Sequence, residues 1–286
     1  MRVVAALLVV LATGVGDSDA QSDDVSFLVM GKTTNHRQGP SGELSLLNYH
    51  FFAEIFVKEG RSVTAASLGF PDGSTKPFED LGFVQEVHGG RYERESELDA
   101  LYPNGTYAFR FDTASARVDR TLEMRGTGEG ESRIPEAVRI TLHQRGRVVS
   151  PSAVDPNEDL TIRWSPFADG EADSNGIVDD LLFAVMGDCR GEKTVHSGRP
   201  FEGTSYLTFA DEAYVFPAAK LNPGESHQIF VEHARVDTST EDGLVGLVTY
   251  AATSFLDFRT TGVALGPACP KDMPKMDAGQ TDRPDK

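Results

Sequence analysis

The chain has 286 residues, of which 27 are Lys or Arg and 44 are Asp or Glu, so its formal net charge at pH 7 is −17. A charge of this sign and size repels the phosphates of nucleic acid and of anionic membranes, so it opposes both as partners. No stretch after the N-terminus approaches about 20 consecutive apolar residues, so we expect no membrane span. The partner we expect is a protein or a glycan, which the sequence does not identify.

The N-terminal segment has the features of a secretory signal peptide. Arg2 is followed by the apolar run VVAALLVVLATGVG, which is too short to cross a bilayer comfortably. The sequence DSDA follows and puts Ser18 and Ala20 at the small-residue positions that signal peptidase recognises. The sequence therefore predicts that residues 1–20 are cleaved and that the mature protein is secreted or periplasmic.

Strand signals run through the N-terminal half of the chain. Residues 48–69 predict two strands on either side of a turn at Glu59-Gly60, and the Pro-Asp-Gly sequence at 71–73 predicts the next turn. Residues 81–88 and 116–125 favour two further strands. The N-terminal half is thus similar in style to the small sandwich domains of large secreted bacterial proteins, a similarity that carries over no functional residues.

The best-defined strand of this half follows a short helical turn at 96–101 and a Pro-Asn-Gly turn. Tyr107, Phe109 and Phe111 alternate with small or polar residues. Because successive side chains of a strand point to opposite faces, this pattern predicts one buried and one exposed face.

A change in composition divides the chain in two. The segment GTGEGES, residues 126–132, is Gly-rich, charged and without periodicity, and it predicts a linker. We therefore expect an all-β fold with two β-sandwich domains in tandem, the first at 21–132 and the second at 133–263. The remaining residues, 264–286, predict a disordered tail.

The second half resembles a known family in the order of its motifs. The sequence DLTIRW places Leu160, Ile162 and Trp164 on one strand face, a Leu-x-Pro-Gly turn comes later, and the last strand ends in Thr-Thr. Together they resemble a fibronectin type III-like sandwich of the immunoglobulin-like group over roughly residues 133–262. In that family a Tyr usually follows the Leu-x-Pro-Gly turn, whereas this chain has His227, so we expect a weaker corner there.

The chain has two cysteines, Cys189 and Cys269. An even number of cysteines in an exported protein favours a disulfide, which would attach the C-terminal segment to the second domain. The alternative is two free thiols. No His base lies close to either cysteine in the sequence, so we do not expect a cysteine nucleophile.

The acidic stretch EADSNGIVDD, residues 171–180, is the candidate metal site. Oxygen-bearing side chains alternate along it, and Gly176 allows the chain to bend, as a calcium loop requires. The four candidate ligands are Glu171, Asp173, Asn175 and Asp179. The twelfth position of such a loop, where a bidentate Glu belongs, is Leu182, so the stretch is not an EF-hand. It is either a weak site for a structural calcium ion or simply an acidic turn, and we expect no other cofactor.

No catalytic motif stands out. The chain lacks a Gly-x-Ser-x-Gly elbow and a His-Glu-x-x-His zinc motif. The prediction is therefore a non-catalytic binding or structural module of the cell envelope or the extracellular space, with no catalytic residues assigned. The alternative is a secreted, carbohydrate-active hydrolase that uses carboxylates in an interdomain cleft. A cleft lined by acids of raised pKa would favour this alternative.

Overall fold

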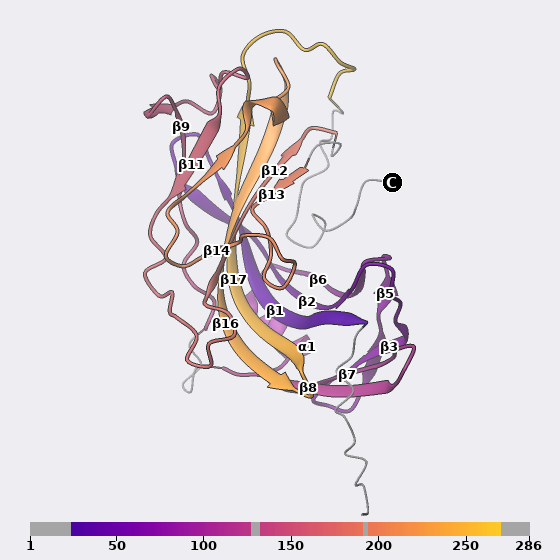
Figure 1. Cartoon of the computed structure of the whole chain (residues 1–286). Helices are drawn as coiled ribbons and strands as arrows, with labels where there is room; N and C mark the ends of the chain where they lie inside the picture. Colours follow the sequence, from indigo (N-terminus) through magenta and orange to yellow (C-terminus); the bar gives the residue numbers. More distant parts are fainter. Residues whose placement is uncertain (1–23, 127–131, 191–193, 270–286) are drawn as a thin grey trace, which may run out of the picture.

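The computed structural model describes residues 24–126, 132–190 and 194–269, and in these ranges the protein consists of β-strands with one short α-helix (Figure 1). No helix within them is long and apolar enough to cross a membrane. The predicted signal peptide, residues 127–131 of the predicted linker and residues 270–286 of the predicted tail lie outside the described residues. The all-β class predicted from the sequence is confirmed.

A nine-stranded sheet forms the centre of the molecule. Its strands are, in spatial order, β13 (Thr194–His196), β12 (Leu181–Asp188), β16 (Ser226–Glu241), β17 (Leu244–Arg259), β1 (Val25–Gln38), β2 (Leu44–Val57), β6 (Val84–Tyr92) and β5 (Glu79–Asp80), while β14 (Leu207–Thr208) pairs with β12. β1 and β17 run parallel, from Phe27 opposite Val245 to Gln38 opposite Leu256. The first and last long strands of the described chain are therefore neighbours.

Two four-stranded sheets pack against the large one. The first contains β4 (Thr75–Pro77), β3 (Thr64–Gly69), β7 (Gly105–Asp112) and β8 (Arg117–Met124), and the second contains β10 (Arg147–Val149), β9 (Ile140–Gln144), β11 (Leu160–Trp164) and β15 (Ala213–Phe216). The helix α1 (Glu95–Leu101) precedes β7, and a 3₁₀ turn, η1 (Ala218–Lys220), precedes β16. Figure 1 shows β9 and β11 beside the upper part of β17, and β7 and β8 at its lower end.

Both small sheets lie on the same face of the large sheet. On β17, Val248 and Tyr250 belong to the core under the first small sheet, and Leu256 and Phe258 belong to the core under the second. These are all even-numbered positions, and side chains of one parity share a face of a strand. An odd-numbered position, Leu247, packs in a third cluster on the opposite face. That opposite face carries the candidate site.

The tandem arrangement of two separate sandwiches is not confirmed. The predicted boundary at residue 132 separates β1, β2 and β6 from β12, β16 and β17, yet all six belong to one sheet. Moreover, Leu244 and Val248 of β17 pack in the hydrophobic core of the N-terminal half. The cores under the two small sheets are joined by one continuous large sheet, and the division at 132 stays a prediction.

Several local predictions are confirmed. Tyr107, Phe109 and Phe111 of β7 are buried on one face, as their alternation predicts. The Tyr107 hydroxyl donates a 2.7 Å hydrogen bond to the carbonyl of Pro103, which ties the strand to the turn before it. The weaker corner expected at His227 stays a prediction; the His227 ring stacks there on Phe258 at 5.1 Å between ring centroids.

The disulfide is also as predicted. Cys189 and Cys269 are bonded, with 5.5 Å between their Cα atoms and 80 residues between them in the sequence. Arg190, next to Cys189, donates a 2.9 Å hydrogen bond to the carbonyl of Pro267 and pairs with Glu225 at 2.6 Å. The bond therefore holds the chain after β17 against the end of β12, where the sandwich ends.

Candidate functional site

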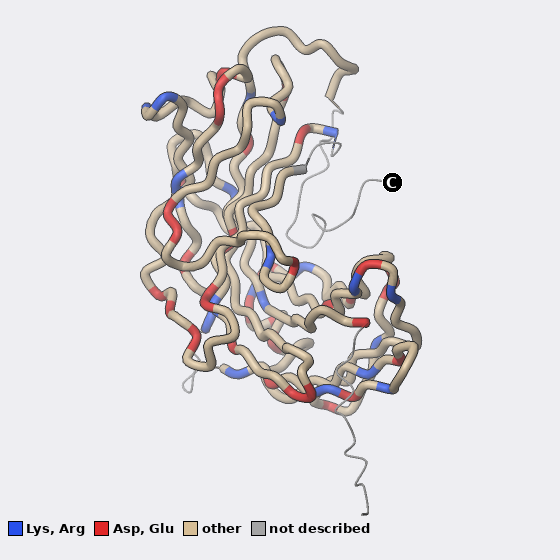
Figure 2. Tube along the Cα trace, viewed as in Figure 1, with Lys and Arg blue, Asp and Glu red and all other residues tan. Residues whose placement is uncertain are grey.

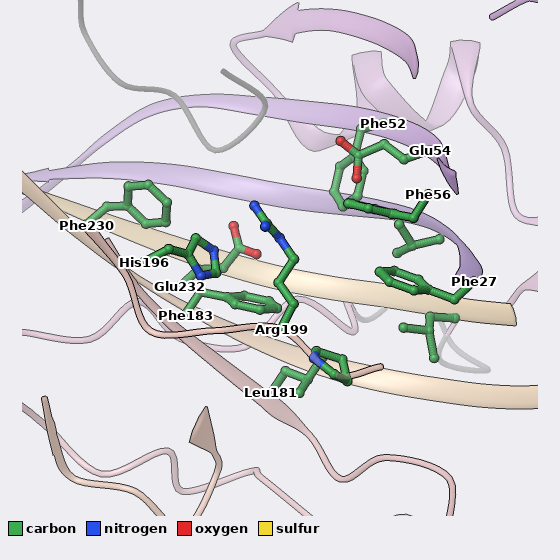
Figure 3. Close-up of a pocket in the computed structure, with 13 residues that line it drawn as sticks. Phe27, Phe52, Glu54, Phe56, Leu181, Phe183, His196, Arg199, Phe230 and Glu232 are labelled. Carbon is green, nitrogen blue, oxygen red and sulfur yellow. The ribbon is translucent and has the colours of Figure 1, made fainter. Parts of the chain in front are cut away.

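The candidate site lies on the face of the large sheet opposite the two small sheets. It is a cavity of ≈ 80 Å³, measured as the space that the centre of a water molecule can reach. Its walls are mainly aromatic and aliphatic and come from β1, β2, β12, β16, β17 and the segment after β13; they include Phe27, Phe52, Phe56, Phe183, Phe230, Leu181 and Leu247 (Figure 3). Its polar groups are Glu54, Glu232, His196 and Arg199. We call it the aromatic cavity.

Glu54 brings a buried carboxyl group into the aromatic cavity from β2. Odd-numbered residues of this strand face the core of the N-terminal half, so the even-numbered Phe52, Glu54 and Phe56 face the cavity. The residue is 6% exposed, and no hydrogen bond joins its carboxyl group to any other residue in the described ranges. Burial and the nearby Glu86 raise the pKa of Glu54 to about 8, although Arg199 opposes the rise.

Glu232 brings a second carboxyl group from β16, in the other half of the chain. It is 9% exposed, and burial raises its pKa to about 7. The Thr253 hydroxyl donates a 2.7 Å hydrogen bond to it and lies 3.4 Å from the hydroxyl of Thr33 on β1. Three neighbouring strands thus fix the position of this carboxyl group.

The segment of residues 197–206 lies over the aromatic cavity, and we call it the cover segment. Figure 3 shows the Arg199 side chain reaching from it toward the carboxyl groups of Glu54 and Glu232. The ring of Phe201 packs on Phe27 with 5.4 Å between centroids. Gly198 has φ = 96°, and a Cβ there would lie 2.0 Å from the carbonyl oxygen of Ser205, so only glycine fits this turn.

His196 completes the polar set of the aromatic cavity. Burial, together with the charge of Arg199, lowers its pKa to about 3, so the ring is neutral at physiological pH. Its Nδ1 accepts a 3.0 Å hydrogen bond from the Gly198 N–H. With a neutral imidazole and one guanidinium beside two carboxyl groups, the cavity has fewer positive groups than acids.

The carboxyl groups of the aromatic cavity have a recognisable signal in the sequence. Glu54 lies in HFFAEIFV and Glu232 lies in QIFVEHA, so each is an acid inside an apolar strand. Acids are almost never fully buried unless they are paired or functional, so such positions are candidates from sequence alone. Their meeting could not be read from the sequence, because it depends on the parallel pairing of β1 with β17.

The acidic stretch at 171–180 forms a loop on a different part of the surface, between β11 and β12. The Asp173 carboxylate accepts hydrogen bonds from the backbone N–H groups of Asn175 at 2.9 Å, Ile177 at 2.8 Å and Val178 at 3.2 Å. It also accepts one from the Thr238 hydroxyl at 2.8 Å. Burial raises the pKa of Asp173, but these hydrogen bonds outweigh it and lower the pKa overall.

The other candidate calcium ligands lie around Asp173. Asp179 accepts a 2.9 Å hydrogen bond from the Asp173 N–H, and the Asn175 side chain donates to the carbonyl of Thr238 at 3.2 Å. Glu171 is placed by its backbone, whose N–H donates a 3.0 Å bond to Asp180. In the described part of the chain, no group of three or more His, Cys, Asp or Glu side chains lies so that it could hold a metal ion. The calcium site stays a prediction.

Comparison with known proteins adds little to this picture. No protein-family model matches the chain, and no curated protein matches it. Trypsin-activated alpha-2-macroglobulin from Escherichia coli aligns with a TM-score of 0.22 and 9% identity over 83% of this chain and 16% of that one. The FN1–FN3 domains of chicken CNTN1 align with a TM-score of 0.19 and 12% identity over 73% of this chain and 62% of that one. This chain therefore spans less than two thirds of either protein, and similarities this weak carry no argument about it.

Proposed function

We propose that the chain is an exported, non-catalytic binding or structural module of the cell envelope or the extracellular space, with the aromatic cavity as its binding site. The observation that carries this proposal is the size of the cavity, ≈ 80 Å³. Pockets that enclose whole small-molecule ligands are roughly 300–1,000 Å³. A cavity this small receives one chemical group of a partner.

Two observations support export. The disulfide between Cys189 and Cys269 is of the kind that persists in oxidising compartments outside the cytosol. The sequence of residues 1–20 predicts a cleaved signal peptide. The similarity of residues 133–262 to a fibronectin type III-like sandwich is part of the same proposal, because such domains commonly present surfaces for protein partners.

One observation favours the alternative, a carbohydrate-active hydrolase. Glu54 and Glu232 come from the two halves of the chain, line one cavity and have raised pKa values of about 8 and about 7. Glycosidases use a pair of carboxyl groups, one of them an acid of raised pKa. The small volume of the cavity and the Arg199 side chain inside it weigh against this alternative, because a sugar ring needs open space between the two carboxyl groups.

An activity assay separates the two functions. The full mature chain is incubated with a panel of chromogenic glycosides, alongside Glu54→Gln and Glu232→Gln. A non-catalytic module gives the same background hydrolysis in all three proteins. Turnover by the native chain that falls by about a hundredfold or more in either variant would establish the hydrolase and overturn our proposal, since general acid–base catalysis contributes about 10²–10⁴-fold.

A further inference from the structure

The carboxyl groups of the aromatic cavity receive few hydrogen bonds. Glu54 receives no hydrogen bond within the described part of the chain, and Glu232 receives one, from Thr253. An ionised carboxylate offers about four acceptor sites, and a buried carboxylate without donors is costly. We therefore expect a bound ligand to supply further hydrogen-bond donors to these carboxyl groups.

Arg199 is the one cation that faces Glu54 in the described residues. The other titratable groups that face it are Glu86 on the neighbouring strand β6, Glu232 on β16, and His196 at the end of β13, whose ring is neutral. With a pKa of about 8, Glu54 itself keeps its proton at neutral pH. A cation that enters the cavity would take the place of that proton.

We propose that the aromatic cavity binds a primary ammonium group, which Glu54 receives as an ionised carboxylate. This inference rests on the binding function proposed above and names the chemistry of its ligand. A primary ammonium group supplies three N–H donors to a carboxyl group that receives none from the described part of the chain, and its positive charge replaces that of the proton which Glu54 releases. The aromatic walls add to the attraction, because the face of a Phe ring stabilises a cation within about 6 Å of its centroid.

The size of the cavity sets what can carry this ammonium group. A volume of ≈ 80 Å³ holds a few water molecules or one small head group. The end of a lysine side chain and a short free amine share this chemistry, so both are possible sources.

Isothermal titration of the full mature chain tests the proposal. The probes are methylammonium chloride and a blocked Gly-Lys-Gly peptide, with tetramethylammonium chloride as a cation that has no N–H donor and sodium chloride at matched ionic strength. With a pKa of about 8, the ionised fraction of Glu54 rises from about 1% at pH 6 to about 90% at pH 9. At least one primary ammonium probe is expected to bind tenfold or more tightly at pH 9 than at pH 6, while tetramethylammonium and sodium do not.

Two variants locate the binding. Glu54→Gln is expected to abolish the pH-dependent binding, whereas Glu136→Gln, at an exposed position outside the aromatic cavity, leaves it unchanged. Binding of the peptide alone assigns the source to a protein lysine, and binding of methylammonium assigns it to a free amine; either outcome supports the proposal. Should Glu54→Gln fail to fold, the pH series of the native chain decides.

Three results would overturn the inference: no binding of either primary ammonium probe, equal binding of tetramethylammonium, or binding that is the same at pH 6 and pH 9. None of these three results contradicts the proposed function, because the glycoside assay tests that function separately. A non-catalytic chain that does not bind ammonium would still be a binding module, with a different ligand.

Discussion

Gln38 and Ile140 are joined by two hydrogen bonds of 2.7 Å, although they lie 102 residues apart. The Gln38 side chain, at the end of β1, donates to the carbonyl of Ile140 and accepts from its N–H, as a neighbouring strand would at the start of β9. Nearby, Arg139 donates a 3.2 Å bond to the carbonyl of Gly42 in the β1–β2 turn. The β1–β2 hairpin of the N-terminal half is thereby fastened to the first strand of the C-terminal half.

Removing this contact should destabilise the whole protein. Gln38→Ala leaves a buried N–H and a buried C=O of Ile140 without partners, which costs about 1–3 kcal/mol. Urea unfolding followed by circular dichroism measures the loss. Ser41→Ala, in the exposed turn of the same hairpin, is the control and should change the free energy of unfolding by less than about 0.5 kcal/mol. Equal stability of the two variants would show that the contact contributes nothing.

The same contact bears on the predicted division of the chain. Because β1 pairs with β17 along its length and Gln38 holds β9, cleavage in residues 127–131 should give two fragments that stay associated. Size-exclusion chromatography of the nicked protein checks this. Fragments that separate and remain folded would instead support the tandem domains predicted from the sequence.

Stability should fall as the pH rises above neutrality. Glu54 and Glu232 have pKa values of about 8 and about 7 in the folded chain, against an ordinary value of 4.5. The folded state therefore holds protons that the unfolded chain has released, so the stability from these groups is full below about pH 4.5 and is lost as the pH rises through 7 and 8. One such group changes the free energy of unfolding by about 1.4 kcal/mol per pH unit within its window.

Three histidines with lowered pKa values act in the opposite direction at lower pH. His50, His196 and His233 have pKa values of about 3, lowered mainly by burial, so the stability from their neutral rings is full above about pH 6.5 and is lost as the pH falls below it. Above about pH 7.5 these histidines are almost wholly neutral in both the folded and the unfolded state. Urea unfolding at pH 7.5, 8.0 and 8.5 should therefore show the loss of stability from the carboxyl groups, and Glu54→Gln should reduce the slope of the free energy of unfolding against pH. A flat profile in the native chain would contradict the raised pKa values.

Trp164 should be a core residue, and its fluorescence emission reports whether it is buried. It is 6% exposed, and its Nε1–H donates a 3.0 Å hydrogen bond to the carbonyl of Asp211. Trp164→Ala is expected to cost about 3–5 kcal/mol. Trp164→Phe keeps most of the ring packing but leaves that carbonyl without its donor, so it should cost less. Since Trp164 is the only Trp in the chain, an emission maximum typical of an exposed indole in the folded protein would contradict this burial.

Reduction of the disulfide should lower stability. A bond that closes a loop of about 80 residues restrains the unfolded chain by roughly 4 kcal/mol in the loop-entropy model. The double variant Cys189→Ser with Cys269→Ser is compared with the native chain by urea unfolding, each with and without reductant. The native chain should lose stability in reductant, and the variant should not respond. If reductant leaves the native chain unchanged, the bond contributes no stability.

Local features of this fold were predictable, and long-range ones were not. The alternation at Tyr107, Phe109 and Phe111 identified a strand because burial of one face is a local property of the sequence. β1 was not identified, because VSFLVMGKTTNHRQ is buried on both faces at its start and so lacks a period of two. The pairing of β1 with β17 joins positions about 220 residues apart, which no local pattern encodes. The aromatic cavity was missed for the same reason, since Glu54 and Glu232 meet only through that sheet.

The loop at 171–180 gives the last prediction. Asp173→Ala should destabilise the loop whether or not calcium is present, because it removes the acceptor of four hydrogen bonds that shape the turn. Calcium dependence therefore needs a variant that spares these bonds. Glu171→Gln is suitable, because its side chain is exposed and the bond that places Glu171 comes from its backbone N–H.

If the loop holds calcium, the melting temperature of the native chain rises with calcium and falls with chelator, and Glu171→Gln reduces the difference. Binding to the folded state alone adds about 1.4 kcal/mol at tenfold excess of calcium over Kd. Magnesium should replace calcium poorly, because it demands a tighter octahedral set of ligands. With Leu182 in the position of the bidentate Glu, the expected affinity is millimolar at best. Melting temperatures that are the same in calcium and in chelator would show that hydrogen bonds to Asp173 hold the loop without an ion.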